Sequence, residues 1–312
     1  MPFSLDDKHI VIHYHYIEDS TKENRGMNPC PIFEFEKHVA FLSKNYKSAS
    51  LEKVFEAGKS GAEERYYAIT FDDGLKDQFK NAVPILKKYG AHASFFIITQ
   101  TLEGILPSAH KFHAILSRIT SLEAIDLWNI FIKEKYPEHA AHFFIPKDYR
   151  IVKDRRLYAD IPTSNIKEIF TAVPTAVRDD FLSFIFKKYN LNENGLCNAM
   201  FMTADEIKDI RSQGFLIGVH SHVHEPIGVL GKEGFHEDFK KSKEWFIRII
   251  GGNPILFSYP YGIIPEWGSF AVEREGITHA ITVEEGAILP DDSPLLIPRY
   301  DMASLRYFLT KQ

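Results

Sequence analysis

Short apolar runs alternate with amphipathic stretches over most of this 312-residue chain, and this alternation limits the possible folds more than any other feature. The amphipathic stretches space their apolar side chains as helices do. Such alternation predicts βα units and a mostly parallel sheet, and about seven units with continuously apolar strands favour a closed barrel over an open sheet. The expected strands lie at residues 10–16, 67–71, 93–98, 215–219, 255–259, 279–283 and 295–297, and helical stretches include 33–46, 75–89, 204–213 and 235–250.

One long stretch, residues 101–198, interrupts this rhythm and contains no convincing strand. Its apolar residues repeat at helical spacing, for example at Phe112, Ile115, Leu116 and Ile119. We therefore expect one barrel over residues 1–312 with a helix-rich insertion at 101–198. The insertion is either a lid over the mouth of the barrel or a packed cap without a function of its own.

The composition excludes several classes of protein. The net charge is −5 and no strongly basic face is indicated, which disfavours a nucleic-acid partner. Two cysteines, Cys30 and Cys197, are too few for a disulfide scaffold and are expected to be free thiols. The N-terminus lacks the pattern of a signal peptide, and no run approaches the ~18 apolar residues of a membrane span. The expected location is the cytoplasm, and the oligomeric state stays open.

Two adjacent carboxylates, Asp72 and Asp73, follow the apolar run that ends at Phe71. They belong to the segment Thr-Phe-Asp-Asp-Gly at 70–74, which can also be read as a plain turn. Two like charges held side by side repel each other unless a cation or a proton neutralises one of them. A metal bound to one carboxylate would leave the other free to accept a proton.

Three histidines, His220, His222 and His224, follow another apolar strand at alternate positions. On an extended strand His220 and His224 would lie ~13 Å apart, too far to share one ion. If the chain turns after Val219, residues four apart become neighbours and can bind one metal. The pairing of His220 with His222 on an extended strand is the alternative.

A third strand ends in Pro260, Tyr261 and Gly262. Proline and glycine shape a sharp turn whose exposed amides can stabilise an oxyanion, although a plain turn has the same composition. Because the three motifs all follow strands, we expect them at one edge of the barrel. One carboxylate and two histidines make a three-ligand set with an open position for water, as catalytic zinc requires.

In these motifs the chain resembles the polysaccharide deacetylase family, also called NodB-homology enzymes or carbohydrate esterase family four. The resemblance is carried by the segment at 70–74, by His220-Ser221-His222-Val223-His224 and by Tyr259-Pro260-Tyr261-Gly262. Weaker support comes from Tyr14-His15-Tyr16-Ile17. The resemblance covers about residues 1–100 and 200–300 and leaves the helical insertion outside.

The resemblance implies a distorted (β/α) barrel that removes an acetyl group from an acetylated saccharide, with N-deacetylation expected before O-deacetylation. It implies a divalent metal, with Zn²⁺ as the expected ion, bound by Asp73, His220 and His224. Asp72 would be the general base, and the backbone amide of Tyr261 would stabilise the oxyanion. Metal binding lowers the pKa of water towards ~7, which agrees with this assignment.

Two departures from the family pattern leave the catalytic acid open. Ser258 stands where many members have an arginine that pairs with the base, and the segment from Leu295 to Asp301 lacks the usual histidine. We hypothesise that His15 or His222 is the acid, or that Asp72 returns its own proton, and that Arg299 replaces the missing arginine. The candidate substrate contacts are Pro260, His222 and Arg299.

Two other functions remain open at this point. The same residues could serve a metal-dependent amidase that acts on a non-sugar substrate. The departures also allow a catalytically weak, carbohydrate-binding relative.

Overall fold

The first of two compact units contains one curved sheet of eight strands, all paired in parallel, in the computed structural model, which describes residues 3–21, 27–153 and 159–311. This unit comprises Met1–Ser20, Pro29–Pro107 and Cys197–Gln312. Its strands are β1 (His9–Tyr14), β2 (Lys47–Ser48), β3 (Tyr66–Phe71), β4 (Ala93–Ile97), β5 (Leu216–Val219), β6 (Leu256–Ser258), β7 (His279–Ile281) and β8 (Tyr300–Asp301).

The sheet runs in the order β7-β6-β5-β4-β3-β1-β8, with β2 paired to β3 at the side. One C-terminal segment joins its two ends. The backbone N–H of Ile297 donates to the carbonyl oxygen of Ala280 on β7 (2.9 Å), and three residues later Tyr300 pairs with Ile12 on β1. Through this segment the sheet closes on itself as a distorted (β/α) barrel, which confirms the predicted fold class.

The structure corrects two of the expected strands. Residues 295–297 form only a single bridge, between Ile297 and Ile281, and the last strand lies at Tyr300–Asp301. Pro298 separates the two pairings, because proline has no N–H to continue a ladder. The first strand ends at Tyr14 rather than at residue 16, so His15 lies beyond it.

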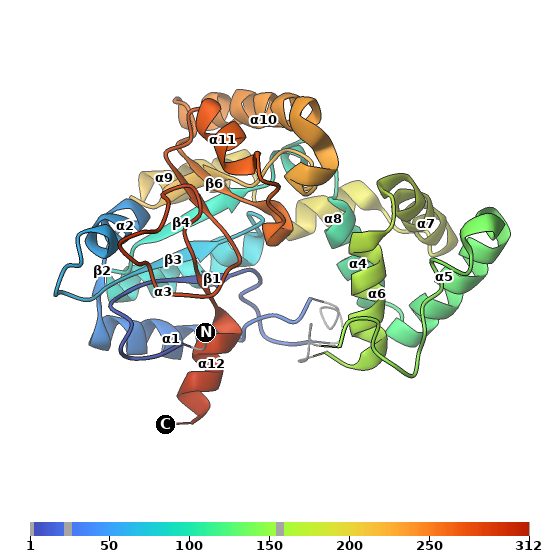
Figure 1. Cartoon of the computed structure of the whole chain (residues 1–312), viewed down its shortest axis with the longest axis horizontal. Helices are drawn as coiled ribbons and strands as arrows, with labels where there is room; N and C mark the ends of the chain where they lie inside the picture. The colour runs from blue at the N-terminus through green and yellow to red at the C-terminus, as the bar shows by residue number, and fades with distance from the viewer. Residues whose placement is uncertain (1–2, 22–26, 154–158, 312) are drawn as a thin grey trace. The chain divides into compact units, whose positions relative to one another are not determined.

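Helices surround the barrel, with α1 and α3 on one side and α10 and α11 on another (Figure 1). The predicted helix at 75–89 begins as a π-helical turn, η1 (Gln78–Ala82), and the helix that ends at residue 250 is broken at Gly231, whose φ is +69°. The helices of this unit are α1 (Ile32–Asn45), α2 (Leu51–Lys59), α3 (Val83–Tyr89), α9 (Ala204–Ser212), α10 (Ile227–Ile250), α11 (Gly268–Arg274) and α12 (Met302–Thr310), with short 3₁₀ turns η2 (Thr99–Glu103) and η4 (Pro260–Gly262).

Alternate strand residues face the two sides of the sheet and so divide the core in two. Val11, Ala68 and Phe96 pack with α2 in one cluster, whereas their chain neighbours join the helices outside the sheet. Gly218 on β5 makes room for this packing, because a Cβ atom there would lie 2.6 Å from the ring of Phe96. Thr70 has the same parity as Ala68 and is also buried, so on β3 a polar side chain follows an apolar one towards the carboxyl end of the strand.

The second unit comprises Thr21–Asn28 and Ser108–Leu196, whereas the sequence predicts an insertion at 101–198. The rings of Phe112 and Phe170 stack at 4.3 Å, and Trp128 meets Phe181 edge to face at 5.0 Å, which gives this unit a core of its own. Its helices are α4 (Ser108–Leu116), α5 (Ser121–Lys135), the 3₁₀ turn η3 (Pro137–His139), α6 (Ile161–Ala172), α7 (Thr175–Lys188) and the start of α8 (Glu193–Met200).

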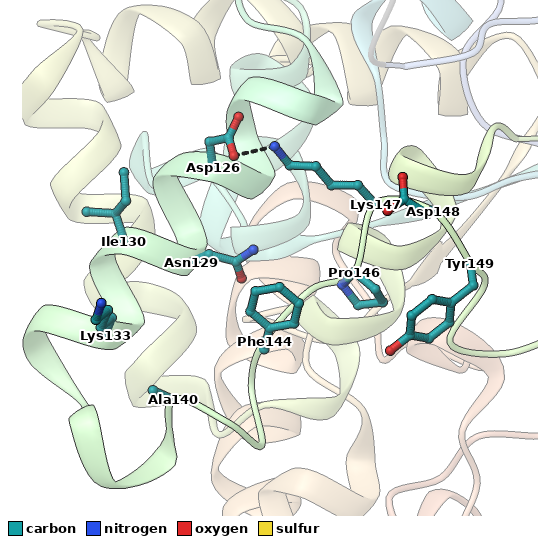
Figure 2. Close-up of a pocket in the computed structure, with 10 residues that line it drawn as sticks. All are labelled: Asp126, Asn129, Ile130, Lys133, Ala140, Phe144, Pro146, Lys147, Asp148 and Tyr149. Carbon is teal, nitrogen blue, oxygen red and sulfur yellow. Dashed lines mark hydrogen bonds and ion pairs between the residues drawn. The ribbon is translucent and has the colours of Figure 1, made fainter.

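An open cavity of about 650 Å³ lies on the surface of the second unit, between α5 and the segment that follows η3 (Figure 2). Phe144 and Tyr149 line it with exposed rings, and Lys147 forms an ion pair with Asp126 at its edge.

Among the described residues of both units, no helix is long and apolar enough to cross a membrane.

Candidate active site

Strand β3 delivers two adjacent carboxylates to the carboxyl edge of the barrel. The backbone N–H of Asp72 still donates to the carbonyl oxygen of Tyr14 (3.1 Å), which extends the ladder by one residue. Asp73 then adopts a left-handed conformation, with φ at +76°, and Gly74 follows with the same φ. Both carboxylates are buried, and the turn between them allows each to meet a different set of neighbours.

A tight turn after β5 brings His220 and His224 together, with ring centroids 4.8 Å apart. Ser221 has a left-handed backbone (φ +62°), and its hydroxyl oxygen accepts a hydrogen bond from the N–H of His224 (2.8 Å). The segment therefore has the turned conformation expected from the sequence. It does not pair His220 with His222 on an extended strand, because Nδ1 of His222 faces the hydroxyl of Thr99 at 3.0 Å.

Asp73, His220 and His224 converge on one point. Nε2 of His220 lies 3.6 Å from Oδ1 of Asp73, and Nε2 of His224 lies 3.5 Å from the same oxygen. One ligand atom from each of the three residues lies within 4.8 Å of the others. Nδ1 of His220 lies 2.8 Å from the carbonyl oxygen of Ser258, which can only accept, so Nδ1 carries the proton and Nε2 presents its lone pair. One carboxylate oxygen and two imidazole nitrogens fit a divalent metal such as zinc.

Asp72 pairs with a different cation, the guanidinium of Arg299. Nη1 of Arg299 donates to Oδ1 of Asp72 (3.1 Å) and Nη2 donates to Oδ2 (2.8 Å), a two-pronged geometry that only arginine provides. Burial by itself would raise the pKa of Asp72, but the charge of Arg299, followed by those of His220 and His15, holds that pKa well below its usual range. Asp72 is therefore ionised at neutral pH.

Arg299 is fully buried, and protein atoms surround its guanidinium. Its Nε donates to the carbonyl oxygen of Thr282 (2.7 Å), and its Nη atoms also reach the hydroxyls of Thr70 (3.1 Å) and Ser258 (3.4 Å). A substrate contact expected for Arg299 has no support in this arrangement. The arginine instead reaches Asp72 from the segment that closes the barrel.

The sequence interpretation missed the pair of His13, which is buried, and Asp301, which is partly exposed, near His15. Nε2 of His13 lies 3.0 Å from Oδ2 of Asp301, and the rings of His13 and His15 meet edge to face at 5.4 Å. Burial by itself would raise the pKa of Asp301. The hydrogen bond and the charge of His13 lower that pKa by more, so the net shift is downward. His15 itself is exposed. The His-x-His spacing at the end of β1 is the signal that could have found His13.

The third motif forms the 3₁₀ turn η4 after β6. Tyr261 has a left-handed backbone (φ +59°), and its ring lies 4.9 Å from the ring of His224. Only glycine fits at position 262, because a Cβ atom there would lie 2.1 Å from Cγ2 of Val283. Pro260 is buried and shapes the turn. The motif therefore packs against the histidine side of the site.

His222 is buried and faces η2. Its Nε2 lies 4.0 Å from Oε1 of Glu103, and the same oxygen accepts a hydrogen bond from the indole N–H of Trp245 (2.7 Å). Burial lowers the pKa of His222, and the charge of Glu103 only partly opposes this effect. These contacts favour an anchoring role over the substrate contact or the catalytic acid expected from the sequence.

Left-handed backbones at residues other than glycine concentrate in these turns. Among the described residues they occur at Asn28 and Asn190, where asparagine tolerates them, and otherwise only at the three motifs. Each costs on the order of 1–3 kcal/mol and persists only where the surroundings impose it, a pattern typical of functional sites. The four strained residues of the motifs are Asp73, Ser221, His224 and Tyr261.

Comparisons with solved structures agree with the fold. The chain is similar to the Streptococcus pyogenes deacetylase PplD in complex with acetate, with a TM-score of 0.60 and 16% identity over 100% of both chains. It is also similar to IcaB from Ammonifex degensii, with a TM-score of 0.58 and 15% identity over 95% of this chain and 92% of that one. At these identities the likeness extends to the fold alone.

Sequence comparisons add the family. The chain is 37% identical over 89 residues to YxkH of Bacillus subtilis (strain 168), a match that covers 27% of this chain and 29% of that protein. The family model described as polysaccharide deacetylase matches residues 59–119 and 179–278, which is just over half of the chain. The matched ranges include Asp73, His220 and His224. The chain therefore belongs to the polysaccharide deacetylase family.

Proposed function

We propose that this protein is a metal-dependent deacetylase that hydrolyses the acetamide group of an N-acetylated sugar unit in a glycan. The observation that carries this proposal is the convergence of Asp73, His220 and His224 beside a second, ionised carboxylate, Asp72. Family membership supports a hydrolase that acts on acetylated sugar. The metal, with zinc as the expected ion, and the preference for nitrogen belong to our proposal.

A divalent metal held by Asp73, His220 and His224 would polarise both water and the acetyl carbonyl. Asp72 is the general base in this scheme. Its pairing with Arg299 keeps the carboxylate ionised and orients it, so it can accept the proton of the attacking water. Arg299 acts through Asp72 and is a positioning residue.

Two further groups would complete the reaction. The backbone N–H of Tyr261, in the strained turn η4, is our candidate for a hydrogen bond to the oxyanion that develops on the acetyl carbonyl. An amine leaves only after protonation, and His15 is our candidate acid because it is exposed and close enough for its charge to affect Asp72. An acid of this kind is needed for an N-acetyl group more than for an ester, which favours N-deacetylation.

The test combines metal content with acetate release. We expect the purified protein to bind one Zn²⁺ per chain and to release acetate from N-acetylated glycan oligomers. Removal of the metal by a chelator should abolish acetate release, and added Zn²⁺ should restore it.

Other outcomes would select the alternatives. Bound metal together with hydrolysis of simple amides, but without acetate from any glycan, would favour an amidase that acts on a non-sugar substrate. A protein that binds glycans but neither metal nor acetyl substrates productively would be a carbohydrate-binding relative, and our proposal would be wrong.

A further inference from the structure

The turn that carries His220 and His224 is held by a carboxylate from a helix that follows it. Oδ2 of Asp238, on α10, accepts a hydrogen bond from the backbone N–H of His222, and Oδ1 accepts one from that of Val223, both at 2.9 Å. Asp238 is buried, with 6% of its surface exposed. One carboxylate therefore pairs with two successive amides in the middle of the turn.

Four other backbone groups of the turn have partners of a different kind. They bond to the last residue of β4, to the segment after it or within the turn itself. The bonds are His220 N to Ile97 O (2.8 Å), Thr99 N to Ser221 O (3.2 Å), Gln100 N to His222 O (3.1 Å) and His224 N to Ser221 Oγ (2.8 Å). The amides of residues 222 and 223 are the two that depend on the side chain of Asp238.

We propose that Asp238 is a positioning residue for the metal site. Ser221 and His224 have left-handed backbones (φ +62° and +60°), a conformation that persists only where the surroundings impose it. Asp238 imposes it by accepting from both amides between them, and this brings Nε2 of His220 and His224 to the same side of Asp73. The inference rests on the proposed function, because it concerns the metal ligands of that site.

The chemistry of the pair explains why an aspartate stands at this position. A carboxylate offers two acceptor oxygens, one for each amide, whereas the amide group of asparagine offers one acceptor and one donor. Asp238→Asn therefore leaves one backbone N–H opposite another N–H group. Burial raises the pKa of Asp238 to about 6, so measurements at pH 7.5 find the carboxylate ionised.

The test measures metal affinity in the full chain. We expect Asp238→Asn to weaken Zn²⁺ binding about 10- to 100-fold, the range found when a group that orients a metal ligand is removed. The absorption spectrum of the Co²⁺-loaded protein should change as well, because it reports ligand geometry. Asp238→Glu keeps the charge but displaces the oxygens by one methylene, and it should lie between wild type and Asp238→Asn.

Asp160→Asn is the matched control. The carboxylate of Asp160 also accepts a backbone N–H, that of Thr163 (2.7 Å), but in the second compact unit. Its Zn²⁺ affinity and Co²⁺ spectrum should equal those of wild type. Hydrogen exchange of the metal-free proteins should show faster exchange around residues 222 and 223 in Asp238→Asn alone.

Two results would contradict us in different ways. Zn²⁺ affinity within twofold of wild type and an unchanged Co²⁺ spectrum in Asp238→Asn would overturn the role of Asp238 while leaving the proposed function intact. If Asp238→Asn does not fold, the same comparison is made with Asp238→Glu. Absence of Zn²⁺ binding in wild type would instead overturn the ligand assignment itself, and the role of Asp238 with it.

Discussion

The two neighbouring carboxylates at the end of β3 differ in almost every respect except their position. Asp72 gives both oxygens to Arg299, whereas Oδ1 of Asp73 faces the Nε2 atoms of His220 and His224. Adjacent buried anions repel each other, and under the proposed function each member of this pair has a separate source of positive charge. For Asp72 the source is the permanent charge of Arg299, and for Asp73 it is the divalent metal that we propose.

Under the proposed function, this difference separates the general base, Asp72, from the metal ligand, Asp73. The carboxylate of Asp72 remains ionised whether or not a metal is bound, because the buried guanidinium of Arg299 lies beside it. The side of Asp73 combines a carboxylate with two imidazoles, a set suited to metal binding. The comparison therefore predicts that substitution of Asp72 leaves metal binding by Asp73, His220 and His224 intact.

The largest effect is expected on the metal side. Asp73→Ala and His220→Ala should each reduce bound Zn²⁺ to background, as measured by elemental analysis, and lower acetate release by about a thousandfold or more. Asp205→Ala, at an exposed position on α9, is the control and should retain both. Unchanged metal content in both variants would contradict the ligand assignment.

The base side should lose catalysis without losing metal. Asp72→Asn removes the proton acceptor, and we expect kcat to fall by about 10²- to 10⁴-fold while bound Zn²⁺ stays at the wild-type level. Metal analysis and acetate release from the same preparation provide the measurement. Loss of metal in this variant would show that the two sides are not separate.

Removal of the permanent charge should reduce stability in a pH-dependent manner. Arg299→Met leaves Asp72 buried without its cation, and we expect a loss of about 3–5 kcal/mol in the free energy of unfolding at pH 8. In wild type the pKa of Asp72 is lowered, so its stabilisation is complete above the unfolded value of ~3.9 and is lost only as the pH falls through the lower folded value.

In the variant, burial without Arg299 should raise the pKa of Asp72 above its unfolded value. Protonation then relieves the buried charge, so the difference from wild type should shrink as the pH falls from 8 to 5. Urea unfolding at both pH values measures it. A difference that is equal or greater at pH 5 would contradict this account of Arg299.

The smallest of these effects concerns the return of the proton. His15→Ala should lower N-deacetylation by about a hundredfold, because the leaving amine then lacks its proton donor. Acetate release across pH provides the measurement, and His139→Ala, at an exposed position in the second unit, is the control. A nearly unchanged rate would exclude His15 and indicate that Asp72 serves as both base and acid.

Local sequence patterns were sufficient for much of the fold. Apolar strands alternating with amphipathic helices indicated the barrel, and the three motifs lie at strand ends because each follows such a run. Errors arose where long-range pairing decides the element. Residues 295–297 have a strand-like composition, but Pro298 follows them, and the ladder resumes only at Tyr300 against β1.

The sequence by itself determined which chemical groups stand at the strand ends: two carboxylates after β3, histidines spaced four apart after β5 and a Pro-Tyr-Gly turn after β6. Only the tertiary structure decided their partners. Arg299 lies 227 residues from Asp72 along the chain and reaches it because the C-terminal segment closes the barrel. Such partners leave no local pattern, since their pairing depends on the closure of the whole sheet rather than on spacing.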